Sequence, residues 1–179
     1  MSKNFWHDIE TGKDVPEIIN AIVEIPKGSM NKYEYDKKHN MMKLDRVLFS
    51  PFHYPGDYGL IPQTLSEDGD PLDALVLVTN PTYPGILIES RPIGLLQMKD
   101  DGEPDDKIIC VSTNDPRYLH TTDINDIEDH YRSEIAHFFQ VYKELEGKKV
   151  EIIGWKSSKD AKVVIIESIK RYKDTLKKY

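Results

Sequence analysis

The chain has 179 residues, 39% of them hydrophobic and 31% charged, so it can fold around one core and remain well solvated. Its formal net charge of −7 argues against general affinity for nucleic acid or anionic membranes, although a local basic cluster can still bind a small anion. No apolar run approaches the ~20 residues of a membrane span, no signal-peptide pattern opens the chain, and a single cysteine excludes an internal disulfide, so we expect one cytoplasmic domain, residues 1–179.

The first two thirds of the chain have the patterns of β-strands. Residues 21–28 are apolar and β-branched, residues 31–38 alternate polar and aromatic side chains, and residues 41–50 follow a turn at His39-Asn40. These three segments predict an antiparallel meander. Further strands are expected at residues 74–78, 86–100 and 107–113. Because prolines and glycines separate several short strands, the pattern favours a small closed barrel.

The last third of the chain is expected to be mainly helical. Its first helix has an apolar stripe with three- and four-residue spacing, formed by Ile127, Tyr131, Ile135, Phe138, Phe139, Tyr142 and Leu145. Asp126 is the expected N-cap and Gly147 the expected C-cap. A strand follows at residues 150–155, and a second amphipathic helix runs from about residue 160 to 177, capped by Ser157 or Ser158. The fold class is therefore α+β and mainly β, a barrel with two helices.

Acidic side chains concentrate in two loops. Residues 67–73 hold four carboxylates directly before an apolar strand, and residues 100–106 hold five at the junction of two other strands. Such a run is usually a solvated loop, but here glycine and proline hold a turn that is anchored to buried strands. Carboxylates a few ångströms apart repel each other by roughly 1–4 kcal/mol per pair. Hard divalent cations such as Mg²⁺ or Mn²⁺ remove that penalty, so the loops predict a metal site.

Two other metal sites do not fit the spacing. Counted from Asp68, an EF-hand would need a ligand at Leu72, a glycine at Asp73 and a glutamate at Thr79. Zinc is poorly supported because the six histidines form no tight ligand pair.

A site with several metals needs an anionic substrate to share them, and phosphate is the usual one. Candidate phosphate ligands occur in other segments. They are Lys32, Arg46, Tyr54, Tyr58, Tyr142 and Lys143. Taken singly, each is more simply explained as a surface or core residue.

Taken together and in order, these segments resemble the soluble, Mg²⁺-dependent inorganic pyrophosphatases of family I. The resemblance rests on "IVEIP", "KYEYD", "LDR", "YPGDYG", "EDGDPLDALVL", "RPIGLLQMKDDGEPDDK" and "IAHFFQVYKELEG", and it covers about residues 15–155. The D-G-D-P-x-D core is the most specific element. The resemblance implies a five-stranded OB-type barrel flanked by two helices, a homohexamer and a cytoplasmic location.

The resemblance also implies a role for each matching residue. Metal ions would be held by Asp68, Asp73, Asp100, Asp105 and Glu24. Phosphates would be bound by Lys32, Arg46, Lys107, Tyr142 and Lys143. Asp70 matches the general base, Tyr58 would hydrogen-bond near the nucleophile, and Glu34 and Tyr54 would support the site. The choice between Asp105 and Asp106 as a ligand stays open.

The expected activity is hydrolysis of pyrophosphate to two orthophosphates by a metal-activated water. Mg²⁺ is the expected cofactor, with Mn²⁺ or another divalent ion as a substitute. Two alternatives remain. One is a related metal-dependent hydrolase of nucleotides or polyphosphate, although neither a Walker-type loop nor an obvious stacking motif is found. The other is a non-catalytic barrel, either an OB-type binding module or a metal buffer. An oligonucleotide-binding barrel usually presents a basic and aromatic face, whereas this chain is acidic.

Overall fold

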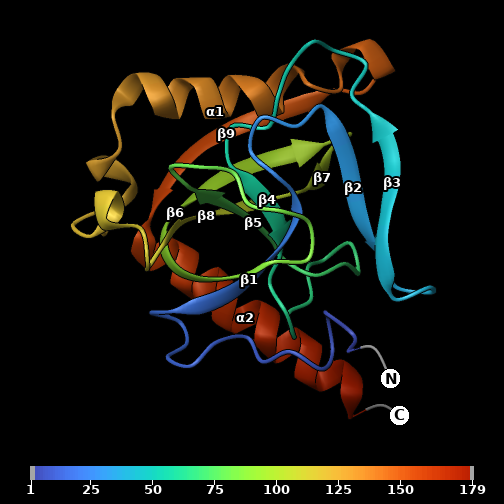
Figure 1. Cartoon of the computed structure of the whole chain (residues 1–179), viewed down its shortest axis with the longest axis vertical. Coiled ribbons are helices and arrows are strands. Elements are labelled where there is room, and N and C mark those ends of the chain that lie inside the picture. The colour runs from blue at the N-terminus through green and yellow to red at the C-terminus, as the bar shows by residue number, and fades with distance from the viewer. Residues whose placement is uncertain (1–2, 178–179) are drawn as a thin grey trace.

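The computed structural model describes residues 3–177. Five strands form its barrel: β1 (Ile19–Ile25), β4 (Asp57–Leu60), β5 (Asp73–Leu77), β8 (Lys107–Ser112) and β6 (Leu87–Asp100). They pair in that order, and β6 pairs with β1 to close the ring (Figure 1). The β5–β8 pair is parallel and the other four pairs are antiparallel. The mainly β fold with a closed five-stranded barrel is confirmed.

The expected meander of the first three segments is wrong. β2 (Asn31–Asp36) and β3 (Met41–Val47) form a separate hairpin beside the barrel (Figure 1). The physical reason is that both edges of β1 are already occupied, one by β4 and the other by β6. β2 therefore cannot pair with β1, although the two lie in contact. The hairpin is left to form a wall at one side of the barrel.

Strand β4 was not predicted, because the proline and glycine residues of "YPGDYG" suggested a turn. Gly59 explains why a strand fits there. A β-carbon at this position would lie 1.9 Å from the carbonyl oxygen of Ile22, so only glycine permits the close approach of β4 to β1. Two further strands extend the sheet: β7 (Glu103–Pro104) and β9 (Val150–Ser157), both paired with β6.

The first predicted helix is shorter than expected. α1 spans Asp129–Val141 and is followed by a 3-10 turn, η3 (Glu144–Glu146). Asp126 is not its N-cap, because its carboxylate accepts hydrogen bonds from the Thr122 and Asp123 amides and closes another 3-10 turn, η2 (Ile124–Asp126). Gly147 caps η3 with a φ of 75°. Leu145 is 65% exposed and does not belong to the core.

The second helix was predicted closely. α2 spans Ser158–Leu176, and Ser157 is its N-cap. The Ser157 hydroxyl accepts from the Asp160 amide at 3.4 Å, while the Asp160 carboxylate accepts from the Ser157 amide at 3.0 Å. This capping box fixes the start of the helix. A further 3-10 turn, η1, spans Pro116–Tyr118. Across residues 3–177, no helix combines the length and apolarity that crossing a membrane requires.

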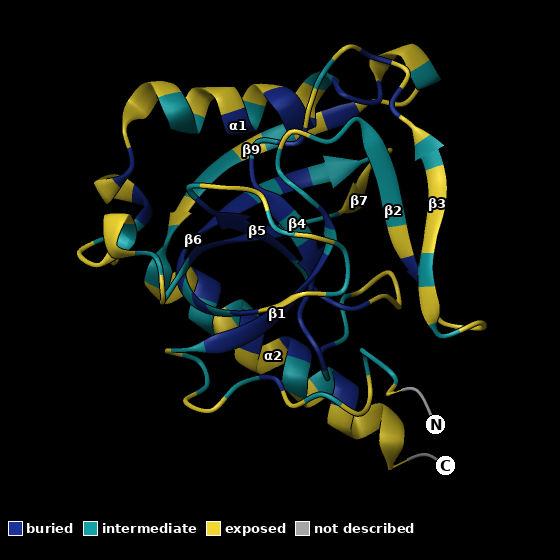
Figure 2. Cartoon of the chain, viewed as in Figure 1, coloured by how far each residue is buried: buried dark blue, intermediate teal, exposed yellow. Residues whose placement is uncertain are grey.

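Buried residues concentrate in the barrel strands (Figure 2), and they form clusters on both faces of these strands. Along β5, Leu75 and Leu77 pack on the side of α1, and Ala74 and Val76 pack on the side of α2. Because both faces of β5 are buried, its start at Asp73 is rigidly placed. The acidic loop 66–72 leads directly into this strand, so its carboxylates are anchored to the most buried part of the fold.

Candidate active site

A cavity of about 600 Å³ opens between the β2–β3 hairpin, the acidic loop 66–72 and the turn that joins β6 to β8. Most of the predicted site residues line it. They are Glu24, Lys32, Glu34, Tyr58, Asp68, Asp70, Asp73, Asp100, Asp105, Tyr142 and Lys143. Lys107, Arg46 and Tyr54 are not part of this lining. Lys107 is ion-paired with Asp73 and Asp105 of the lining, Arg46 lies opposite Lys32 in the hairpin, and the Tyr54 ring centroid is 6.4 Å from that of Tyr142.

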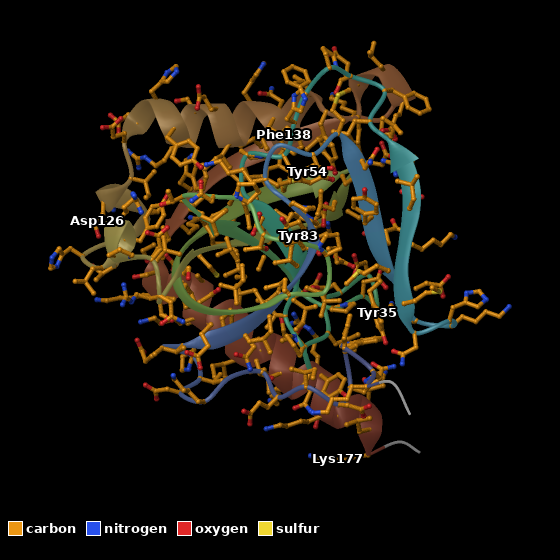
Figure 3. All side chains as sticks on the ribbon, in the orientation of Figure 1. Tyr35, Tyr54, Tyr83, Asp126, Phe138 and Lys177 are labelled. Atoms are coloured by element: carbon orange, nitrogen blue, oxygen red, sulfur yellow. The ribbon has the colours of Figure 1, made fainter. Side chains whose placement is uncertain are left out.

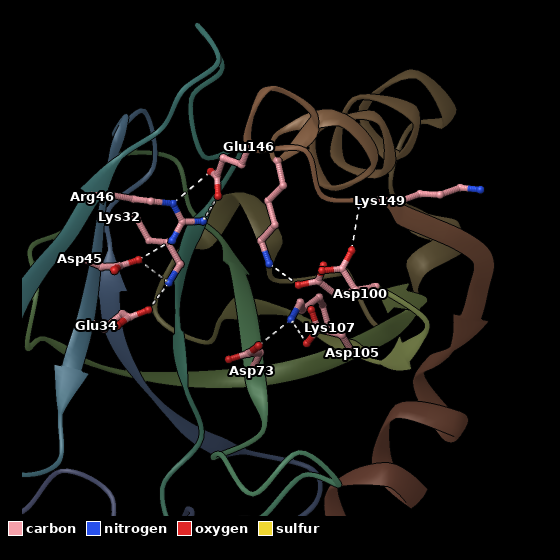
Figure 4. Close-up of polar contacts among 12 residues, drawn as sticks. Lys32, Glu34, Asp45, Arg46, Asp73, Asp100, Asp105, Lys107, Glu146 and Lys149 are labelled. Atoms are coloured by element: carbon pink, nitrogen blue, oxygen red, sulfur yellow. Dashed lines mark hydrogen bonds and ion pairs between the residues drawn. The ribbon is translucent and has the colours of Figure 1, made fainter.

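Lys107 joins the two acidic loops. Parallel pairing of β5 and β8 sets Asp73 directly opposite Lys107. The ammonium donates to the Asp73 carboxylate at 2.6 Å and to that of Asp105, and its side chain is only 2% exposed (Figure 4). Burial alone would lower the pKa of Lys107, but the two carboxylates outweigh burial and raise it above its ordinary value. The loops therefore meet, as the barrel predicted.

A second cation holds the other side of the cavity. The Lys143 ammonium, from the turn after α1, donates to the Asp100 carboxylate at the end of β6. Burial opposes the charge on Lys143, but Tyr142 and Asp100 together raise its pKa. The other carboxylate oxygen of Asp100, Oδ1, is buried and has no hydrogen-bond partner.

The β2–β3 hairpin supplies a third group of charges (Figure 4). Its register sets Lys32 opposite Arg46. Lys32 donates to Glu34 and, at 3.2 Å, to Asp45, while Arg46 also pairs with Glu146 at 2.8 Å. Sequence reasoning missed Asp45 and Glu146. The alternating pattern of the hairpin offered a signal for Asp45, whereas Glu146 arrives from η3 and only the fold reveals it.

Loop 66–72 presents its acids without a buried cation. The Asp68 carboxylate accepts from the Asp70 amide at 2.9 Å, and the Ser66 amide donates to the Asp70 carbonyl at 2.7 Å. Burial raises the pKa of Asp68, and the nearby charges of Asp70 and Asp73 add to that shift. The side chain of Asp70 is 64% exposed and forms an ion pair with Lys37, a residue that sequence reasoning also missed.

Three further predicted groups lie deeper. The Glu24 carboxylate accepts from the Tyr35 amide at 2.7 Å, and desolvation raises the pKa of Glu24 to about 8. Tyr54 is buried with its ring centroid 4.8 Å from that of Phe138, a pair labelled in Figure 3. The Tyr58 ring lies 5.7 Å from the Lys107 ammonium.

The residues present fit a divalent cation. Within residues 3–177 no three His, Cys, Asp or Glu side chains already lie close enough together to form a ligand set, and the Lys107 ammonium lies between the carboxylates of Asp73 and Asp105. The donors are nevertheless carboxylate oxygens clustered on one cavity wall, which is the chemistry that hard divalent ions prefer. The buried, unpartnered Oδ1 of Asp100 is an oxygen that still requires a partner. Asp68, Asp73 and Asp105 face the same space.

Comparison with known proteins places the chain in one family. Residues 21–173 match the family described as Inorganic pyrophosphatase. The chain belongs to this family. A pyrophosphatase relative from Halalkalibacterium halodurans, named Inorganic pyrophosphatase, is 52% identical over 158 residues, covering 88% of this chain and 97% of the relative.

Another relative with that name, from Haloferax volcanii, is 51% identical and covers 96% of this chain and 97% of its own length. The crystal structure of the inorganic pyrophosphatase from Thermus thermophilus superimposes with a TM-score of 0.93 at 46% identity, covering 96% of this chain and 99% of that one. The likeness to that structure therefore extends over nearly the whole chain.

Proposed function

We propose that this chain hydrolyses inorganic pyrophosphate to two orthophosphates. The observation that carries the proposal is the meeting of two acidic loops and three groups of cations around one cavity. Membership of the inorganic pyrophosphatase family supports the same reaction. The cavity presents both parts that the chemistry needs, because the cations neutralise phosphate charge and the carboxylates bind metal and accept a proton.

Each part of the cavity has a proposed role. Lys32, Arg46 and Lys143 bind the phosphates, with Tyr142 and Lys107 completing that set. Asp70 accepts a proton from the attacking water, because its exposed carboxylate faces the cavity. Tyr58, which also lines the cavity, orients that water by a hydrogen bond, and Glu34 and Tyr54 support the neighbouring side chains.

The proposed metal ligands are Asp68, Asp73, Asp100 and Asp105, with Glu24 acting from deeper in the cavity. Mg²⁺ is the proposed ion, and Mn²⁺ the proposed substitute. When bound, such an ion supplies charge neutralisation and a water of lowered pKa. The side chain of Asp106 accepts from the Met98 amide at 3.2 Å and is absent from the lining of the main cavity, so we propose Asp105 and not Asp106 as the ligand.

The test is phosphate release from pyrophosphate, ATP and tripolyphosphate, each with and without Mg²⁺. We expect Mg²⁺-dependent release from pyrophosphate with a kcat/KM far above that for ATP. Comparable values for the two substrates would favour a general phosphohydrolase, and no release from any of them would favour a binding module.

Three further features remain proposals. The resemblance to family I suggests a homohexamer, a single domain over residues 1–179 and a cytoplasmic location. The hexamer is tested by light scattering, with an expected mass of six times the 20.7 kDa chain. A monomer at working concentration contradicts it.

A further inference from the structure

Lys37 lies at the mouth of the cavity and has no role in the scheme above. It is in the turn between β2 and β3, it lines the cavity, and its ammonium pairs with the Asp70 carboxylate. The turn itself is well held. The Asp36 carboxylate accepts from the Lys38 and His39 amides at 2.9 Å each. The backbone therefore presents Lys37 at a defined place on the rim.

The N-terminal segment fixes the side chain of Lys37. Its ammonium lies 4.5 Å from the ring centroid of Trp6, within the range of a cation–π contact. The indole is itself anchored, because its Nε1–H donates to the Thr64 carbonyl at 2.8 Å and the Trp6 carbonyl accepts from the Gln63 amide at 2.9 Å. Residues 6 and 64 thus bring an aromatic face to the rim of the acidic loop.

Folding stability does not explain this arrangement. The Lys37 side chain is 42% exposed, and exposed ion pairs of this kind contribute little to stability. The lysines deeper in the cavity differ, since Lys107 and Lys143 are largely buried against their carboxylates. Of these three cations, Lys37 is the most accessible to an anion that approaches from solvent.

The ion pair between Lys37 and Asp70 conflicts with the proposed role of Asp70 as a general base. Asp70 must accept a proton from water, and an ammonium on the same carboxylate competes for its oxygens. A pyrophosphate that enters the cavity carries more negative charge than one carboxylate and attracts the ammonium more strongly. Exchange of partners frees Asp70 and adds a cation to the substrate.

We propose that Lys37, held at the cavity mouth by Trp6, is an additional pyrophosphate-binding residue that exchanges Asp70 for a substrate phosphate. The inference rests on the proposed function and assigns a substrate-binding role to a residue outside the recognised motifs. It also gives the N-terminal aromatic residue a positioning role. Because Lys37 is accessible, it steers the anion toward the site as well as binding it.

The test compares steady-state hydrolysis of pyrophosphate by Lys37→Ala, Lys37→Arg and Lys38→Ala at saturating Mg²⁺. Lys38 is an exposed neighbour of equal charge outside the cavity lining, so Lys38→Ala is the matched control. We expect Lys37→Ala to raise KM about twofold to fivefold, as for one partly exposed charge contact, with kcat changed less than about twofold. Lys37→Arg restores most of the KM.

Salt dependence and a second position complete the test. The kcat/KM of the wild type should fall more steeply with ionic strength than that of Lys37→Ala. Trp6→Leu should also raise KM. The double variant Trp6→Leu/Lys37→Ala should have a KM close to that of Lys37→Ala alone. Melting temperatures identify any variant that fails to fold, and the exposed Lys37 variants decide the question if Trp6→Leu does fail.

The outcomes separate the two proposals. A wild-type chain without pyrophosphate hydrolysis overturns the proposed function. An active wild type in which Lys37→Ala matches Lys38→Ala in KM and salt dependence overturns the role of Lys37 alone. A loss of kcat at unchanged KM also overturns it, because the residue would then act only through Asp70. Additive effects of the Trp6 and Lys37 changes overturn the role of Trp6.

Discussion

Replacing Asp70 and Asp68 by asparagine, one at a time, distinguishes a proton acceptor from a metal ligand. The two residues are separated only by Gly69, yet their surroundings differ. Asp70 is 64% exposed and pairs with an exposed lysine, so Asp70→Asn should change stability by less than about 1 kcal/mol. Its kcat should nevertheless fall by roughly 10²–10⁴, the usual contribution of a positioned general base. Mg²⁺ affinity should change less.

Asp68 should respond in the opposite way. Burial and neighbouring carboxylates raise its pKa, so the folded state disfavours the charged form. Removing that charge should leave the metal-free protein at least as stable as the wild type. Because an anionic oxygen ligand is lost, Asp68→Asn should bind Mg²⁺ more weakly, and added metal should restore part of its rate.

The assays are calorimetric titration of Mg²⁺, urea unfolding without metal, and pyrophosphate hydrolysis at low and saturating Mg²⁺. If added metal rescues Asp70→Asn and not Asp68→Asn, the two roles are reversed. If neither variant loses activity, loop 66–72 is a solvated acidic turn and the catalytic interpretation is refuted.

Three predictions concern folding stability. Lys107→Met removes a buried ammonium that holds two carboxylates, and urea unfolding without metal should show a loss of about 3–5 kcal/mol; an unchanged midpoint would contradict the pairing. Gly59→Ala places a β-carbon 1.9 Å from a backbone oxygen, so the melting temperature of this variant should fall sharply. Gly28 has open space around it but a φ of 82°, so Gly28→Ala should lower the melting temperature by a smaller amount. Burial lowers the pKa of His7 from its ordinary value of 6.5, so the imidazole binds a proton more readily in the unfolded chain than in the folded one. The free energy of unfolding should therefore fall as the pH drops through 6.5 and below. The melting temperature of His7→Gln should decline less steeply over the same pH range.

The sequence by itself determined much of the fold. Alternation and apolar runs located β2, β3, β5, β6 and β8 within about three residues at their ends. The serine pair Ser157 and Ser158 marked the start of α2, and the structure selects Ser157 as the N-cap through a capping box, a local interaction between residues three apart. Local chemistry of this kind is readable without knowledge of the rest of the chain.

The candidate site was partly readable for the same reason. The acids of residues 67–73 are adjacent in the chain, and their crowding before a buried strand is a signal in itself. The roles of Lys32, Arg46 and Lys143 came from the ordered resemblance to a family, since each lysine or arginine alone looks like a surface residue.

Tertiary structure decided what depends on distant partners. The sequence did not predict β4, because the reason for Gly59 is the backbone of β1, which packs directly against this position. The predicted meander does not form, because β6, some 60 residues further along the chain, pairs with the edge of β1 that β2 would need. Trp6 reaches Lys37 because Thr64 and Gln63 hold the N-terminal segment beside the acidic loop. Local pattern reports which segments form strands and turns, but the choice of partner depends on competition among all the edges and faces that the fold brings together.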